Sequence, residues 1–151
     1  MKYTTEITIA LPRAEVIKKL DNADNIKHWQ RGLTGVEHIS GTPGEFGAKM
    51  QFSYQFGKRK MELTETITKS NFPQEFHATY NTKGMHNIQK NYFTETPQGH
   101  TIWTSESEFL PTNFMMRVMT LLMPRAFKKQ SLKYLTDFKN FAENGTSVAE
   151  A

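Results

Sequence analysis

Glu65 is the polar residue whose place in the sequence most suggests chemistry. It shares the parity of Leu63 and Ile67 along an alternating segment, so it should point toward the apolar side of a strand. A carboxylate there would be partly desolvated, which raises its pKa and suits general acid or base catalysis. The alternatives are a strand end that is open to water, or an ion pair with a cation such as Arg117 or Lys90. We favour a structural or ligand-anchoring role over catalysis.

Arg117 is the only charged residue in the apolar segment Phe114–Met123. A guanidinium in such a setting could hold a carboxylate or a phenolate of a ligand. More often an arginine of this kind extends to the mouth of a cavity or to the surface, and we favour that alternative.

Aromatic side chains with a polar handle recur in the predicted strands. They could line a cavity and offer hydrogen bonds to a ligand: Tyr54, Tyr80, Tyr92 and Trp103. Aromatic residues in strands are more often plain core, so this alternative stays open.

Several kinds of site are excluded. The chain has no cysteine and therefore no disulfide or thiolate metal site. The five histidines show no HxH or HExxH spacing, and the glycine-rich loop at 41–47 lacks the GK[ST] ending of a phosphate-binding loop. We therefore expect no metal and no cofactor. The formal charge of +4 comes without a dense basic block, so no nucleic-acid partner is expected.

The size and composition are those of one folded soluble domain, with 151 residues, 37% apolar and 23% charged. No apolar run reaches membrane-spanning length, and the N-terminus shows no secretion signal. We expect no integral membrane association and a cytoplasmic location.

The elements that position these residues are arranged around the last long run, 114–143. It predicts one long helix that Pro124 kinks. After Pro124 the apolar residues recur at helical spacing. The polar residues of that half gather on the opposite, solvated face: Lys129, Lys133, Asp137 and Asn140. Before Pro124 there is almost no polar side, so that half must be buried, lie under a partner or line an apolar cavity.

The rest of the chain predicts a sheet. A strand at 2–10 is followed by a helix that starts at Pro12 and by a short helix at 24–31. Further strands, joined by short turns, are predicted at 36–40, 49–56, 60–69, 75–82, 86–95 and 100–110. This order predicts an antiparallel meander with the long helix laid against it, and residues 144–151 as a tail.

Four local patterns in this order are IALPRAEVIKKLDNADNIKHWQRGL, VEHISGTPGEFGAKM, MELTETI and LKYLTDFKNFAE. With them the chain resembles the START/Bet v 1-like proteins, and among these the polyketide cyclase/dehydrase-like (SRPBCC) proteins of bacteria. The resemblance spans residues 3–143, and its motifs are structural rather than catalytic. It implies an α+β helix-grip fold in one domain, 1–143. A seven-stranded antiparallel sheet wraps around a long C-terminal helix, with two short helices after the first strand.

The resemblance also implies an internal cavity between the sheet and the C-terminal helix, which binds a small hydrophobic or amphipathic, lipid- or polyketide-like molecule. The composition, with eleven Phe and eight Met, favours a cavity, because Met suits adaptable apolar surfaces. A core that is simply filled by side chains remains the alternative. We expect the ligand to contact Trp29, Phe52, Tyr54, Leu63, Tyr80, Tyr92, Trp103, Phe114, Arg117, Val118 and Leu121.

Three functions are then open. The first is a binding protein for such a molecule. The second is an enzyme of cyclase or dehydratase type with Glu65 as acid or base. The third is a protein-interaction module whose Met-rich helix start docks a partner or a second subunit in a homodimer. The third predicts an exposed surface at Met115, Met116 and Met119.

Overall fold

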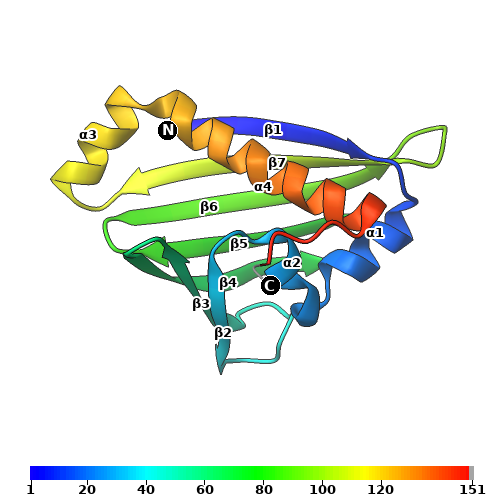
Figure 1. The fold of residues 1–151 in the computed structure, drawn as a ribbon, viewed down its shortest axis with the longest axis horizontal. Helices are drawn as coiled ribbons and strands as arrows, with labels where there is room; N and C mark the ends of the chain where they lie inside the picture. The colour runs from blue at the N-terminus through cyan, green and yellow to red at the C-terminus, as the bar shows by residue number, and fades with distance from the viewer. Residues whose placement is uncertain (150–151) are drawn as a thin grey trace.

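The computed structural model describes residues 1–149, and its elements follow the predicted order (Figure 1). The strands are β1 (Lys2–Ile9), β2 (Leu33–Ser40), β3 (Lys49–Phe56), β4 (Arg59–Asn71), β5 (Glu75–Thr82), β6 (Met85–Glu95) and β7 (Thr101–Pro111). The helices are α1 (Arg13–Leu20), the 3-10 turn η1 (Ala23–Asn25), α2 (Ile26–Trp29), α3 (Phe114–Leu122) and α4 (Pro124–Asn144). The last two residues of the predicted tail, 150 and 151, lie outside the described residues.

The seven strands form one antiparallel sheet in the order β1-β7-β6-β5-β4-β3-β2. Strands β2 to β7 form the predicted meander, and β1 joins the sheet beside β7. The sheet is strongly curved: β2 and β3 run steeply across the direction of β6 and β7 (Figure 1). The long helix α4 crosses the inner face of this curve. The predicted α+β helix-grip architecture is confirmed.

Aromatic rings fix α4 to the sheet. Trp103 on β7 lies opposite Ile7 on β1 and Phe93 on β6, so the three side chains share the inner face. The ring of Phe138 on α4 meets Trp103 edge-on at a centroid distance of 5.4 Å. Trp29 on α2 meets Phe138 in the same manner at 5.3 Å. Sheet, α2 and α4 therefore share one apolar core.

The C-terminal segment is two helices rather than one kinked helix. The backbone leaves helical geometry at Met123, with φ −129° and ψ 47°, and Pro124 is the first residue of α4. Proline has no N–H to continue a helix and disfavours helical geometry in the residue before it. The predicted irregularity at Pro124 is confirmed, but one continuous kinked helix is wrong, because the break separates α3 from α4.

The predicted solvated face of α4 is wrong at Asp137, which is only 5% exposed. The guanidinium of Arg31, just after α2, donates to both carboxylate oxygens, with Nε–Oδ2 at 2.7 Å and Nη2–Oδ1 at 3.1 Å. One turn further along α4, Phe141 stacks on His28 of α2 at 5.4 Å. The prediction failed because α2 covers this flank of α4, and helical periodicity carries no sign of a second covering element.

The Arg31–Asp137 pair yields a stability prediction. Replacing Arg31 by Gln should lower the thermal midpoint by about 3–10 °C, because it leaves a buried carboxylate without a cation. The control is Lys2→Gln, which breaks the exposed pair with Glu108 (3.7 Å). Thermal unfolding followed by circular dichroism provides the measurement. Equal shifts for the two variants would mean that the buried pair contributes no more than a surface pair.

Candidate functional site

Glu65 lies on the inner face of the sheet, as its parity predicts, and is 9% exposed. Its cross-strand neighbours are Met50 on β3 and Tyr80 on β5, and Tyr80 in turn lies opposite Asn87 on β6. The hydroxyl of Tyr80 donates to Oε2 of Glu65 at 2.8 Å. A carboxyl group is therefore held on an otherwise apolar strand face by a tyrosine hydroxyl.

Burial raises the pKa of Glu65, and the hydrogen bond from Tyr80 offsets only part of this effect. Burial and the neighbouring Glu65 also raise the pKa of Tyr80 well above its ordinary value. Among residues 1–149 no lysine or arginine lies within ion-pair distance of Glu65. The alternative of an ion pair with Arg117 or Lys90 is therefore wrong, since both side chains are exposed.

Two further tyrosines belong to the same cluster. Tyr54 on β3 donates its hydroxyl to Oε1 of Gln30 at 3.1 Å. Burial raises the pKa of Tyr54, and so does its proximity to Tyr134 on α4 and to Glu65. Burial also raises the pKa of Tyr134. We call Tyr54, Glu65, Tyr80 and Tyr134 the Glu65 cluster; it joins three neighbouring strands and α4.

Sequence analysis missed Tyr134, although a signal was present. Tyr134 stands one turn before Phe138 and next to Leu135, both of which are buried. Helical spacing alone would have placed its ring at the edge of the buried face. Its hydroxyl makes it part of the site rather than of the core.

Polar side chains continue the inner face beyond the cluster. Residues of β6 and β7 that point inward are buried or half-buried: Asn87, Gln89, Asn91, Ser105 and Ser107. Among them, Asn91 accepts a hydrogen bond from the indole N–H of Trp103 at 2.9 Å. This polar strip was not predicted, because the alternation along β6 gives no clear apolar side.

Two buried polar atoms have no hydrogen-bond partner among the described residues: Oγ1 of Thr5 and Nε1 of Trp29. Thr5 faces inward on β1, directly opposite Ser105. Trp29 packs on Phe138 and Trp103 beside α4. A buried hydrogen-bonding group without a partner costs free energy of folding, so we expect water or a ligand to form hydrogen bonds with these two atoms.

The predicted ligand contacts separate into two groups. Those on the inner side of the molecule lie around the Glu65 cluster and the aromatic core: Trp29, Phe52, Tyr54, Leu63, Tyr80 and Trp103. Val118 is half-buried on α3. Within residues 1–149, no group of three or more His, Asp or Glu side chains could hold a metal ion.

The remaining predicted contacts are corrected by the structure. Tyr92 pairs with Glu75 and Thr104 and meets the ring of His77 edge-on, so it lies on the outer face of the sheet. On α3 three more residues point to solvent instead of lining an enclosed space: Phe114 (80% exposed), Leu121 (75%) and Arg117. Nothing in the described chain covers this side of α3.

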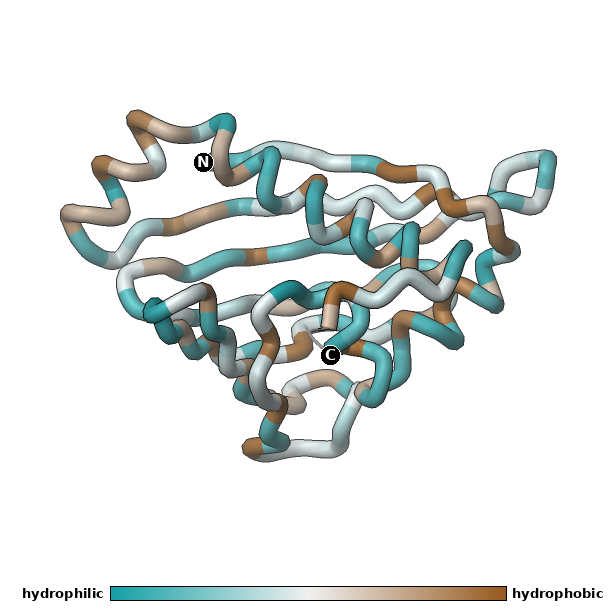
Figure 2. Tube along the Cα trace, in the orientation of Figure 1, coloured by the Kyte–Doolittle hydropathy of each residue, from teal (hydrophilic) through white to brown (hydrophobic). Residues whose placement is uncertain are grey.

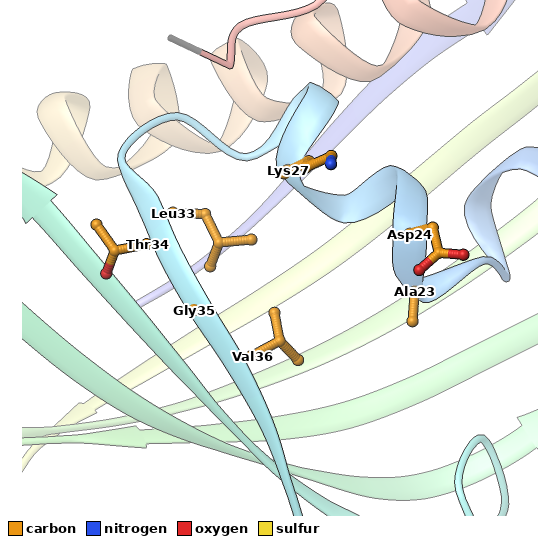
Figure 3. Close-up of a pocket in the computed structure, with 7 residues that line it drawn as sticks. All are labelled: Ala23, Asp24, Lys27, Leu33, Thr34, Gly35 and Val36. Atoms are coloured by element: carbon orange, nitrogen blue, oxygen red, sulfur yellow. The ribbon is translucent and has the colours of Figure 1, made fainter. Parts of the chain in front are cut away.

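A pocket of about 270 Å³ opens between the η1–α2 segment and β2 (Figure 3). Leu33 and Val36 extend from β2 on the side that faces Ala23 and Asp24, whereas Thr34 extends on the other side. Leu33 and Val36 lie opposite Tyr54 and Phe52, which point to the inner face of the sheet. The pocket is therefore next to the inner face at the edge of the sheet that β2 forms.

A second pocket, of about 310 Å³, lies over β1, β6 and β7. Its lining includes outward-facing residues such as Thr4, Lys90 and Glu106. The lining of neither pocket includes a residue of α4. The inner face itself is only partly covered, because Met61, Leu63 and Tyr80 are half-buried rather than buried.

The raised pKa of Glu65 predicts a pH-dependent stability. The folded protein holds the proton more tightly than the unfolded chain, so this contribution is fully present below the ordinary glutamate pKa of 4.5. It is lost as the pH rises through the raised pKa of the folded state. In urea titrations from about pH 4 to about pH 8, the wild type should therefore lose stability relative to Glu65→Gln.

The control for this measurement is Glu62→Gln, which replaces an exposed carboxyl on the outer face of the same strand. The pH-dependent difference should be larger for Glu65→Gln. A difference that does not change with pH would contradict the proposed desolvation of Glu65.

The fold is shared with solved structures at low sequence identity. A conserved protein from Geobacillus kaustophilus superposes with a TM-score of 0.79 at 13% identity, covering 94% of this chain and 95% of its own. Ara h 8.0201 superposes with a TM-score of 0.74 at 13% identity, with 94% and 97% covered. The Zhui aromatase/cyclase from Streptomyces superposes with a TM-score of 0.72 at 10% identity, with 98% and 99% covered. No family profile and no curated protein matches the sequence.

Proposed function

We propose, from the START/Bet v 1-like helix-grip fold that this chain has, that it binds a small amphipathic molecule on the inner face of the sheet beside α4. The observation that carries the proposal is the buried Glu65 carboxyl, whose partner among the described side chains is the hydroxyl of Tyr80. The apolar body of the ligand would lie against Phe52 and Leu63, and its polar group would meet Glu65 and Tyr80.

The chemistry of the Glu65 cluster favours a neutral ligand. A protonated carboxyl and the tyrosine hydroxyls can donate hydrogen bonds to a carbonyl, enol or phenol oxygen. An anionic headgroup is disfavoured, because no cation faces Glu65 among residues 1–149. This supports a polyketide-like aromatic or phenolic molecule over a fatty acid. The indole N–H of Trp29, which has no partner within residues 1–149, offers one more donor.

The opening between α2 and β2 is the proposed route to this site. Leu33 and Val36 line it, and their cross-strand neighbours Tyr54 and Phe52 belong to the inner face. Because Gln30 follows α2 and accepts the hydrogen bond of Tyr54, movement of α2 would alter the Glu65 cluster directly. The volume of about 270 Å³ is near the lower limit for small-molecule pockets.

Binding can be tested with naphthol as a neutral aromatic probe that carries one hydroxyl. Tyr80→Phe should weaken its binding about 5- to 20-fold, because the variant loses one hydrogen-bonding hydroxyl at the site. The matched control is Tyr92→Phe, which removes the same hydroxyl from the outer face. Quenching of the fluorescence of Trp29 and Trp103 reports the dissociation constant.

Equal affinities for wild type, Tyr80→Phe and Tyr92→Phe would contradict a site at the Glu65 cluster. Native mass spectrometry of the freshly purified protein would complement the titration by detecting a co-purified molecule. A bound molecule without hydrogen-bond acceptors would also count against the proposal.

A second candidate is an enzyme of cyclase or dehydratase type that uses the same site. The observation that favours it is the raised pKa of Glu65, because a carboxyl with a raised pKa is a stronger base when ionised and can later return the proton as an acid. The Glu65 carboxylate would take the α-proton of a β-hydroxy ketone to form an enolate that Tyr80 stabilises. Glu65 would then return the proton to the departing hydroxyl, so that the products are water and an unsaturated ketone.

The effect of Glu65→Gln separates the two candidates. If the protein is an enzyme, dehydration of an aromatic β-hydroxy ketone should slow at least about 100-fold in the variant. Affinity for naphthol should fall less than tenfold, since glutamine keeps a donor and an acceptor at the site. The absence of turnover by the wild type on such substrates would leave binding as the function.

A further inference from the structure

Helix α3 carries its apolar residues on the outside. Phe114, Met115, Leu121 and Leu122 are between 73% and 80% exposed. Thr120, in contrast, is buried, and its hydroxyl bonds within the helix. Met116 and Val118 are half-buried beside it, whereas these four apolar side chains and Arg117 face solvent. In a usual amphipathic helix the large apolar side chains would face the protein instead. Such a contiguous apolar face marks an interaction surface.

The charged residues of α3 and of the chain on either side of it, between Glu108 and Asp137, are all of one sign. Between Glu108 and Asp137 the chain contains no acidic residue. It contains a set of exposed basic residues on α3 and the first turns of α4: Arg117, Arg125, Lys128, Lys129 and Lys133. We call these residues, together with the exposed apolar residues of α3, the α3 surface. Its partner should be apolar and anionic at once.

We propose that the α3 surface docks on an anionic phospholipid bilayer. The apolar side chains would enter the boundary between headgroups and acyl chains, and the basic residues would meet lipid phosphates. Docking is peripheral: α3 has nine residues, and no helix within residues 1–149 is long and apolar enough to cross a membrane. The proposal is independent of the ligand that the inner face binds.

The position of α3 agrees with docking on a flat surface. Figure 1 shows α3 at one end of the molecule, beyond the end of β7 and at an angle to α4. Figure 2 shows apolar residues along α3 at that end. A bilayer can therefore reach α3 without displacing the sheet or the contact between Phe138 and Trp103.

A second copy of the chain fits the α3 surface less well. Symmetric pairing would bring the same face of both copies together, and with it Arg117 and Arg125 of each copy. Like charges across an interface are unfavourable, and the segment offers no acidic residue to compensate them. The charges on this surface thus favour lipid phosphate over self-association.

Co-sedimentation with vesicles tests the proposal. The full chain should bind vesicles that contain about one-third phosphatidylglycerol in phosphatidylcholine at least about tenfold more tightly than vesicles of phosphatidylcholine alone. Leu121→Glu/Leu122→Glu should reduce binding to the anionic vesicles at least about tenfold, and Arg125→Glu/Lys128→Glu should do the same. Raising the salt concentration should weaken binding of the wild type.

The control variant is Phe46→Glu. Phe46 is 77% exposed on the loop between β2 and β3, so the variant makes a comparable change of an exposed apolar residue away from α3. It should bind the anionic vesicles like the wild type. Circular dichroism of each variant confirms that it is folded, which is expected because the replaced side chains are exposed.

Three results would overturn the proposal. One is equal binding to neutral and anionic vesicles, or to neither. Another is unchanged binding of Leu121→Glu/Leu122→Glu. The third is a stable dimer in light scattering that this double variant dissociates, since the α3 surface would then be occupied by a second copy.

Discussion

The contact between Phe138 of α4 and Trp103 of β7 is the interaction on which the rest of the structure depends. Trp103 also packs on Phe93 of the neighbouring strand at 5.5 Å, and Trp29 brings α2 to the same cluster. One aromatic cluster therefore fixes the long helix, a short helix and two strands. Along β6, Phe93 and Asn87 are six residues apart, which corresponds to about 20 Å of strand. The polar row of Glu65, Tyr80 and Asn87 thus lies well away from this anchor.

This separation explains why the inner face can carry polar groups. A polar side chain inside a protein costs free energy unless it is hydrogen-bonded, and the anchor at the other end supplies the apolar burial that the polar region lacks. Asn87 donates to the carbonyl oxygen of Glu108 at 3.0 Å, so it is satisfied within the sheet. Glu65 keeps its carboxyl beside Tyr80 in a partly desolvated setting instead. A face built for stability alone would place apolar residues at these positions, and the proposed ligand would offset the cost of the polar ones.

The architecture could be predicted because it follows from alternation and turn spacing. The inward parity of Glu65 was correct, since Leu63 and Ile67 on the same strand fix its apolar side. Tyr92 was placed on the wrong face because β6 has no clear apolar side: its inner positions include Asn87 and Asn91. Alternation identifies the side of a strand on which apolar residues lie. It therefore predicts the wrong inner face where the inner residues are polar. The register of the sheet, which one sequence does not reveal, was needed to correct it.

The burial of Asp137 and the place of Tyr134 in the Glu65 cluster could not be predicted either, because both depend on tertiary contacts. The periodicity of α4 predicts one buried face, whereas the helix meets the sheet on one side and α2 on another. A charged residue on the second side is stable because Arg31 lies opposite, and that juxtaposition joins residues 106 positions apart in the chain. Local sequence patterns contain no record of such a pair.

The break before Pro124 explains how the apolar segment of α3 can be exposed. An apolar segment continuous with α4 would have to follow its axis along the sheet, where the first half could be covered. Once the backbone turns at Met123, α3 takes its own direction and leaves its apolar side in water. Covering a large apolar side chain stabilises by about 1.5–3 kcal/mol, and a basic residue near an anionic surface adds about 1 kcal/mol. The few exposed apolar side chains of α3 therefore suffice for a reversible association, and the neighbouring basic residues determine that the associated surface is anionic.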